Sequence, residues 1–296
     1  MSENGITFWN RKYQKYEQEK VYGQRPMEFL YTNKVGQSIT NSLLAKSFFS
    51  KLYGSYQSSK LSSHKIPNFI NNFQIPMEEY EIKTFSSFND FFIRNFKCGA
   101  RPFTDKENEL AAFAEARYLG FAAIDPKQSF PVKGMDLSIS TLMDSFELSN
   151  PFVGGPCLIA RLCPVDYHRF HFPCDGTYLK YYKVPGKLHS VNPLALKSRS
   201  DIFVTNAREV SILETNNFGK ICYIEVGALC VGRIVQSHSV TGSFKRGEEK
   251  GYFLFGGSTV IIFGEKARWL PSPDILEKTR EKCETLVRLG DTIGVK

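Results

Sequence analysis

From about residue 110 onward, short apolar runs alternate with turn-forming residues, and this pattern constrains the fold more than any other feature of the sequence. The runs include CLIARLCPVDYHRFHF, GTYLKYYKVPG, DIFVTN, KICYIEVGALCVGRIVQ, GYFLF and STVIIF. Runs rich in β-branched and aromatic residues, bounded by turn signals, are typical of strands. We therefore predict a β-rich, mainly antiparallel core over residues 106–296.

The first third of the chain differs in composition and predicts helices. Residues 29–77 contain no Asp or Glu and carry five lysines. Within this block, the apolar residues of 39–56 recur at helical spacing, and SSFNDFFIRNF (86–96) predicts a second, shorter helix. We expect residues 1–105 to form a helical region packed on the β-rich core, which makes the protein α+β.

One more helix is predicted at the end of the chain, in DILEKTREKCETLVRLG (274–290). Asp274 stands at or near its N-cap and Gly290 just after its last turn, which are common signals for the two ends of a helix.

The overall charge favours an anionic partner. The net charge is +8 and the isoelectric point is about 9.0, as for proteins that bind membrane surfaces, nucleic acids or acidic substrates. No stretch approaches the roughly 20 apolar residues of a spanning helix, and residues 1–20 lack the apolar core of a secretory signal. The lysine-bearing amphipathic helix in 39–56 either packs on the core or lies in an anionic membrane interface.

The cysteines indicate a reducing environment. There are seven, at positions 98, 157, 163, 174, 222, 230 and 283, and none forms a C-x-x-C pair. An odd number in mostly apolar surroundings predicts reduced, largely buried thiols in a cytoplasmic protein.

The stretch YFLFGGSTVIIF (252–263) places two glycines and a serine between two strand-forming runs. A Gly-Gly pair in this setting predicts a β-hairpin. A second interpretation is chemical, because the hydroxyl of Ser258 can reach the carbonyl of Gly257 if the backbone bends toward it. A nearby histidine would take the hydroxyl proton and a carboxylate would orient the histidine.

Two of the five histidines lie in DYHRFHFPCDG (166–176), together with Asp166 and Arg169. On a strand, His168 and His171 would face opposite sides, whereas on a helical turn they could share one, and the apolar, aromatic setting favours a strand. Titratable groups crowded into an apolar strand need partners and are typical of functional sites. A metal site would need a third ligand, and neither an H-E-x-x-H nor an H-x-E signature is present. The residues alone do not say which histidine meets Ser258.

The combination of motifs resembles the phosphatidylserine decarboxylases, a family of pyruvoyl enzymes. The likeness covers roughly residues 25–290, and the DYHRFH and GGST motifs together are highly specific. The matching stretches are SSFNDFFIRNFKCGARPF (86–103), KGMDLSISTLM (133–143), DYHRFHFPCDG (166–176), VPGKLHSVNPL (184–194), FVTNARE (203–209), YIEVGALCVGRI (223–234), KRGEEKGYF (245–253) and FGGSTVIIF (255–263).

The resemblance implies that the chain cuts itself between Gly257 and Ser258. The cut would give a β chain, 1–257, and an α chain, 258–296, and would convert Ser258 through an ester and dehydroalanine into a pyruvoyl group. This group would form a Schiff base with phosphatidylserine and act as the electron sink for decarboxylation to phosphatidylethanolamine. No metal is implied.

The resemblance also implies roles for three further residues. His171 would be the base for self-cleavage, and His168 would engage the substrate or protonate the decarboxylated intermediate. The family has an Asp in its processing triad, whereas AAFAEARYLG (111–120) has Glu115 at that place. The extra methylene shifts the carboxylate by about 1.5 Å, a distance that matters in a catalytic site. We expect Glu115 to fill the role, with Asp166 or Asp175 as the alternatives.

The implied partners follow from the substrate, which is a membrane phospholipid. We expect peripheral binding to an anionic membrane on its cytoplasmic face, association of the α and β chains, and a homodimer. The lysines of 29–77 would each add about 1 kcal/mol on anionic lipid.

Other interpretations stay open. A pyruvoyl decarboxylase for a soluble amino acid would have no use for the lysine-rich block 29–77. A relative that has lost processing would act as a lipid-binding module, and Glu115 favours this alternative. A metal-dependent hydrolase could use His168 and His171. Nucleic-acid binding is not indicated, because no glycine-rich or aromatic RNA motif is present.

Overall fold

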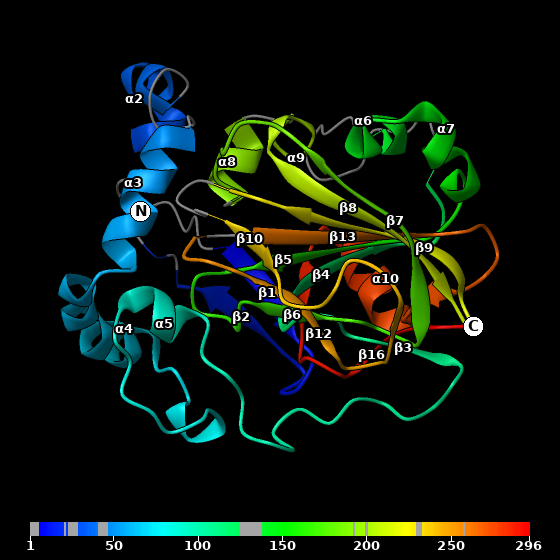
Figure 1. Ribbon diagram of the computed structural model, residues 1–296, viewed down its shortest axis with the longest axis horizontal. Helices are drawn as coiled ribbons and strands as arrows, with labels where there is room; N and C mark the ends of the chain where they lie inside the picture. The colour runs from blue at the N-terminus through cyan, green and yellow to red at the C-terminus, as the bar shows by residue number, and fades with distance from the viewer. Residues whose placement is uncertain are drawn as a thin grey trace.

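The structure is a computed structural model that describes residues 6–20, 22, 29–40, 47–124, 138–191, 193–198, 201–228, 233–256 and 258–296. It combines helices with three sheets (Figure 1), as an α+β protein should. Its strands are β1 (Ile6–Asn10), β2 (Lys15–Glu19), β3 (Glu109–Ala111), β4 (Ala116–Phe121), β5 (Cys157–Leu162), β6 (Arg169–His171), β7 (Gly176–Val184), β8 (Arg208–Thr215), β9 (Gly219–Val226), β10 (Ile234–Gln236), β11 (Ser243–Phe244), β12 (Glu249–Phe253), β13 (Ser258–Gly264), β14 (Leu270–Pro271), β15 (Glu284–Val287) and β16 (Thr292–Val295).

The helices are short, and several begin with a clear cap. In α5, for example, the Ser87 side chain accepts a hydrogen bond from the Asp90 amide, which otherwise has no partner within the helix. The α-helices are α2 (Lys34–Ile39), α3 (Ser47–Gln57), α4 (Ile66–Phe73), α5 (Phe88–Phe92), α6 (Ile139–Met143), α7 (Phe146–Ser149), α8 (Pro193–Ser198), α9 (Ile202–Thr205) and α10 (Pro273–Arg280), and the 3₁₀ helices are η2 (Lys60–Lys65), η3 (Met77–Glu79) and η4 (Asn150–Phe152).

The large sheet has ten strands in the order β11-β7-β8-β9-β13-β5-β4-β15-β1-β2. All neighbours are antiparallel except β1 and β15, which confirms the mainly antiparallel prediction. The central strand β13 is buried along its whole length, which explains why its sequence is a continuous apolar run rather than an alternating one.

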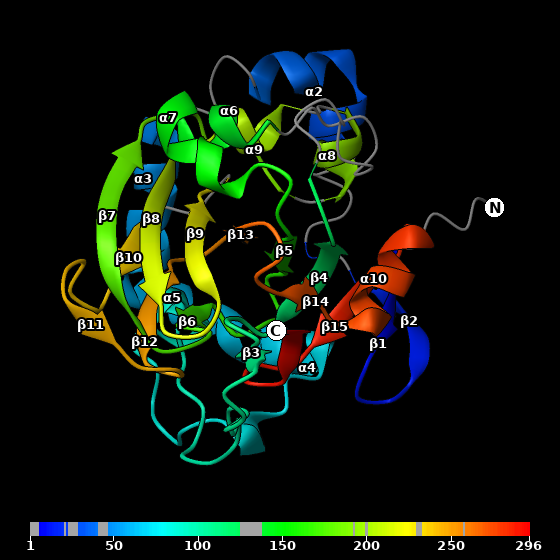
Figure 2. The same ribbon diagram turned by 90° about the vertical axis from the view of Figure 1, so that its right-hand side faces the viewer.

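Both faces of the large sheet are covered. Helices α6 to α9 lie along one face (Figures 1 and 2), where Arg208 of β8 donates to the carbonyl oxygens of Leu142 and Thr141. The three-stranded sheet β10-β12-β6 covers part of the other face. There the wholly buried Lys250 of β12 donates to Glu225 of β9 at 2.5 Å, so an ion pair links the two sheets.

A second, largely aromatic cluster joins the N-terminal helices to the core. Helices α3, α4 and α5 lie together at one end of the β-rich core (Figure 1). Phe255, which follows β12, packs among their rings with centroid distances of 5.0 Å to both Phe88 and Phe92. The short helix α5 therefore contacts the chain just before Ser258.

The hairpin predicted for 252–263 is wrong. Strand β12 pairs with β10 and β6, whereas β13 pairs with β5 and β9, so the chain leaves one sheet after Phe253 and enters another at Ser258. Strand β13 already has a partner on each edge, which leaves no edge for β12. Gly256 has a φ of +142°, a backbone conformation that glycine adopts much more readily than other residues.

Two other local predictions need correction. The predicted helix over 274–290 ends with α10 at Arg280, because Lys282 takes a positive φ of +60° and ETLV then pairs as β15 with β4 and β1. The run DIFVTN, predicted as a strand, forms the single-turn helix α9. Ile202 and Phe203 are buried in the core, so tertiary packing overrides the strand preference of this run.

The N-terminal region is less helical than expected, since β1 and β2 add a hairpin to the edge of the large sheet. The predicted helix in 39–56 is described in part, as α2 and α3, and its middle, 41–46, lies outside the described residues. None of the helices that the structure describes is long and apolar enough to cross a bilayer. The described cysteines are free thiols, and all but Cys98 are buried.

Candidate active site

Ser258 is the first residue of β13 and is fully buried. It pairs with Leu162 of β5, so its position is fixed by the central ladder of the large sheet. Gly257, the other half of the predicted cleavage site, lies outside the described residues. At the predicted cleavage site, the structure therefore describes Ser258 and the residues that surround it.

The histidine in contact with Ser258 is His168. Its Nδ1 lies 3.4 Å from Ser258 Oγ, and its Nε2 lies 2.8 Å from the carbonyl oxygen of Cys163. A carbonyl oxygen can only accept, so Nε2 carries the proton and Nδ1 presents its lone pair to the serine hydroxyl. This is the tautomer that a base for Ser258 requires.

The surroundings of His168 keep its imidazole neutral. The ring is fully buried and stacks on Phe92, with 3.8 Å between ring centroids. Burial, assisted by the charge of Arg94, lowers the pKa of His168 to about 3 despite the hydrogen bond to Cys163. The imidazole is therefore free of a proton on Nδ1 at neutral pH.

The turn that carries the Cys163 carbonyl is held by Asp166. Its carboxylate accepts from the Cys163 amide at 2.7 Å and from Arg117 at 2.6 Å. Burial raises the pKa of Asp166, and the charge of Arg117 opposes that rise. Asp166 thus acts on His168 through the main chain and makes no direct bond to the imidazole.

A network of buried charges surrounds this turn. Arg161 pairs with Glu19 of β2 and with Glu284 of β15, and Arg117 also pairs with Glu19. Although burial would raise it, Arg161 and Arg117 lower the pKa of Glu19 to about 2, so the carboxylate stays ionised. The network connects strands β2, β4, β5 and β15 beneath the site.

His171 lies on β6 in a different environment. Its Nδ1 is 2.9 Å from the carbonyl oxygen of Gly247, and the rings of Phe103 and Tyr167 flank it. Its Nε2 is buried and has no hydrogen-bond partner among the described residues. His168 and His171 are therefore not brought together at Ser258.

Glu115 lies in the turn before β4 and is held by Arg101. One of its oxygens accepts from Arg101 Nη2 at 2.8 Å, and the other accepts from Arg101 Nε and from the Leu289 amide. Among the described residues, these are its hydrogen bonds, and neither histidine is included. Its part in processing stays a prediction.

Two parts of the site were not foreseen from the sequence. The Cys163 carbonyl belongs to the main chain, so no residue type signals it. Asn89 accepts a hydrogen bond from the Phe255 amide at 2.8 Å, three residues before Ser258. The FNDFF motif predicted a short helix at this position, but it did not indicate the contact between Asn89 and Phe255.

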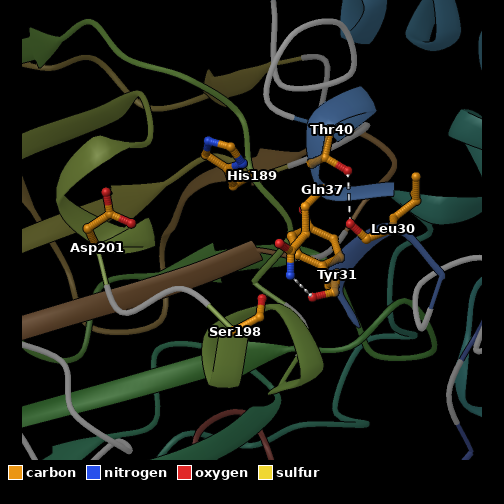
Figure 3. Close-up of a pocket in the computed structure, with 7 residues that line it drawn as sticks. All are labelled: Leu30, Tyr31, Gln37, Thr40, His189, Ser198 and Asp201. Atoms are coloured by element: carbon orange, nitrogen blue, oxygen red, sulfur yellow. Dashed lines mark hydrogen bonds between the residues drawn. The ribbon is translucent and has the colours of Figure 1, made fainter. Parts of the chain in front are cut away.

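A cavity of about 270 Å³ lies between the N-terminal region and the core. Figure 3 shows Tyr31, Gln37 and Thr40 on one side and Asp201 on the other; the remaining lining residues are Leu30, His189 and Ser198. The backbone of His189 is tied through the Asn206 amide to Gly227, which follows the residue that pairs with Thr259. The cavity thus adjoins the end of the sheet at which Ser258 lies.

The protein is therefore of the α+β class, with a buried Ser–His pair where the chain passes from one sheet to another. Comparison with known proteins shows to which family it belongs. The family model described as phosphatidylserine decarboxylase matches residues 88–295. Because the match covers well over half of the sequence, the chain belongs to the phosphatidylserine decarboxylase family, and the resemblance seen in its motifs is confirmed.

Curated relatives match almost the full length. The chain is 45% identical to a phosphatidylserine decarboxylase proenzyme of Clostridium tetani (strain Massachusetts / E88), over 98% of both chains. It is 42% identical to one of Clostridium novyi (strain NT), over 98% of this chain and 99% of the relative. It is 44% identical to one of Clostridium perfringens, over 98% of this chain and all of the relative.

Proposed function

We propose that this protein is a self-processing phosphatidylserine decarboxylase that converts phosphatidylserine into phosphatidylethanolamine and CO2. The observation that carries the proposal is the buried contact between Ser258 Oγ and the unprotonated Nδ1 of His168. The relatives are named proenzymes, a word for proteins activated by processing. We propose His168 as the base for processing, a role that the sequence resemblance had implied for His171.

Self-cleavage then uses groups of this chain alone. His168 Nδ1 accepts the hydroxyl proton while Ser258 Oγ bonds to the carbonyl carbon of Gly257. The Gly257–Ser258 C–N bond breaks, and the imidazolium returns its proton to the leaving nitrogen, which leaves an ester. Loss of the Ser258 α-proton and of the Cβ–Oγ bond releases the Gly257 carboxylate and leaves dehydroalanine. Tautomerisation and hydrolysis by one water then release ammonia and leave a pyruvoyl group.

The residues around position 258 suit such a group. It needs no more room than the serine from which it derives, and His168 Nδ1 already lies within reach of that side chain. A pyruvoyl group supplies an electrophilic carbonyl that binds a substrate amine and accepts the electrons left when CO2 departs. Around it, β13 fixes the position of residue 258, and Phe92 and the Cys163 carbonyl hold His168.

The fold would hold the two products of the cut together. Residues 258–296 contribute β13 and β15, each of which lies between two strands of the larger chain. They also contribute β16, which pairs with β3 of the larger chain on one side. Arg161 and Arg11 of the larger chain pair with Glu284 and Asp274 of the smaller. We therefore propose an α–β heterodimer in the mature protein, and a dimer of such units rests on the family resemblance alone.

The cavity beside the site is the candidate place for the polar head group of the substrate. Its lining combines hydroxyl, amide, imidazole and carboxylate groups from both regions of the molecule. It opens next to the N-terminal helices, from which a membrane lipid would enter.

The N-terminal helices also offer a surface for membrane docking. Leu52, Tyr56 and Leu61 are exposed, and Lys65 lies over the Tyr56 ring at 4.3 Å, with Lys60 nearby in η2. Exposed apolar side chains beside lysines favour an anionic membrane interface. We propose peripheral attachment through this surface at the cytoplasmic face of the membrane.

Decarboxylation of phosphatidylserine in vesicles tests the proposal. The wild-type protein should release CO2 and form phosphatidylethanolamine, and free serine should not be consumed. Ser258→Ala should be inactive, whereas Ser243→Ala, at an exposed position of β11, should be active. Wild-type protein that is cleaved yet forms no phosphatidylethanolamine would contradict the assigned substrate.

Flotation with vesicles that contain anionic lipid tests the membrane surface. Leu52→Glu with Leu61→Glu should reduce the bound fraction, because charged groups replace the inserted side chains. Ile82→Glu, at a residue 91% exposed outside this surface, is the matched control. Equal flotation of all variants would rule out this surface.

A further inference from the structure

Phe255 and Gly256, shortly before the proposed cleavage site, belong to neither sheet. Strand β12 ends at Phe253 and β13 begins at Ser258, so the two residues lie outside both ladders. The amide of Phe255 is nevertheless buried, and a buried amide needs a partner. Its partner is a side chain of the N-terminal region, Asn89 Oδ1 of α5, at 2.8 Å.

Asn89 is itself held from its other end. Its Nδ2 donates to Ser58 Oγ at 2.8 Å and to the Gly54 carbonyl oxygen at 3.4 Å, at the end of α3. The Asn89 side chain is buried, and Ser62 fixes the first amide of the same helix by accepting from Phe88. The amide group of Asn89 therefore has a defined orientation before it meets Phe255.

Helix α5 also supports the base. Phe92, on the same short helix, stacks on the His168 ring and contacts the ring of Phe255. One five-residue helix thus contacts the segment that leads to the nucleophile and the imidazole that would accept its proton. A displacement of α5 would move both.

We propose that Asn89 is a positioning residue for self-cleavage, which holds Phe255 and thereby restrains the chain that leads to Ser258. The inference rests on the proposed self-cleavage. The group of Asn89 that matters is its side-chain oxygen, because the buried amide of Phe255 needs an acceptor. Gly256 has a φ of +142° and lacks a side chain, so it restrains the backbone little. The N-terminal helices then contribute to maturation as well as to membrane binding.

The test is the rate of cleavage of newly synthesised full-length chain, followed by intact mass. Asn89→Ala should slow cleavage about tenfold to a hundredfold, the cost of a misplaced reacting group. Asn89→Asp keeps an acceptor of the same shape and should restore most of the rate. Ser58→Ala, which removes one of the two acceptors of Nδ2 and leaves the acceptor oxygen in place, should have a smaller effect than Asn89→Ala, and Asp90→Asn on the same helix is the control.

Hydroxylamine at neutral pH distinguishes positioning from a later defect, because under these conditions it cleaves an ester much faster than a peptide bond. If Asn89 positions Ser258 for ester formation, hydroxylamine will not restore cleavage of the Asn89→Ala variant. Thermal unfolding of the same variant checks that it is folded. Fast cleavage with hydroxylamine, or no rescue by Asn89→Asp, would overturn the proposal. A wild-type chain that never cleaves would instead overturn the proposed function, so the two failures are distinguishable.

Discussion

His168 and His171 stand three residues apart and both are buried, yet only His168 contacts Ser258. His168 faces Ser258, stacks on Phe92 and has its proton fixed by the Cys163 carbonyl. His171 bonds to Gly247 on the opposite side and leaves its Nε2 without a partner among the described residues. The difference shows that the chain around β6 separates two imidazoles that the motif presents as a pair.

Replacing each histidine in turn should produce the largest difference in cleavage rate. His168→Ala should slow cleavage by a factor of about 100 to 10,000, the usual contribution of a general base, whereas His171→Ala should slow it less than tenfold. Intact mass over time gives both rates. If His171→Ala were the slower variant, the roles would be those that the sequence resemblance implied.

A smaller effect is expected at the turn that orients His168. Asp166→Asn keeps the acceptor for the Cys163 amide but leaves Arg117 without one of its carboxylate partners. We expect cleavage about tenfold slower, because a small displacement of the imidazole is costly. Asp105→Asn, at an exposed position, is the control. Unchanged cleavage in Asp166→Asn would show that the turn does not need this charge.

Glu115 tests whether a carboxylate acts on either histidine. Glu115→Gln should slow processing if the residue fills the role implied by the family resemblance. Because its oxygens bond to Arg101, we expect a smaller effect than in Asp166→Asn. The exposed Glu147→Gln is the control. Cleavage at the normal rate would remove Glu115 from the processing machinery.

A last prediction concerns the stability of the folded chain as a function of pH and not the rate of cleavage. Burial lowers the pKa of His168 from about 6.5 to about 3. Below pH 6.5 the unfolded chain therefore binds a proton that the folded chain refuses, so stability falls as the pH drops from about 6.5 toward 3. The slope from this group is at most about 1.4 kcal/mol per pH unit.

Denaturant unfolding of Ser258→Ala chains, which stay in one piece, measures that slope. Adding His168→Gln should flatten the dependence of the unfolding free energy on pH between 6.5 and 4. An unchanged slope would show that His168 accepts a proton in the folded protein at these pH values.

Much of the fold was predictable, because local patterns decide strands and caps. The runs that form β5, β7, β9 and β13 were recognisable from their β-branched and aromatic residues, and so was α5. The false hairpin had the right strands but the wrong partners. Pairing depends on which edges remain free in the finished sheet, and no stretch of twelve residues contains that information.

The candidate site was predictable in its residue types but not in its contacts. Ser258 and a histidine were expected to meet. Which of the two histidines contacts the serine depends on how the chain is directed at the start of β6. The parts that hold them, the Cys163 carbonyl and the Asn89 amide, come from a turn and a helix distant in sequence. Such contacts follow from tertiary packing, so neither composition nor spacing reveals them.

Whether the chain cuts itself before Ser258 can be decided by intact-mass spectrometry of the purified protein under denaturing conditions. We expect two species, which match residues 1–257 and 258–296, and the smaller should carry the mass of a pyruvoyl group in place of its amino-terminal serine. A single species with the mass of the uncut chain, in protein that is folded and active on phosphatidylserine, would contradict this expectation.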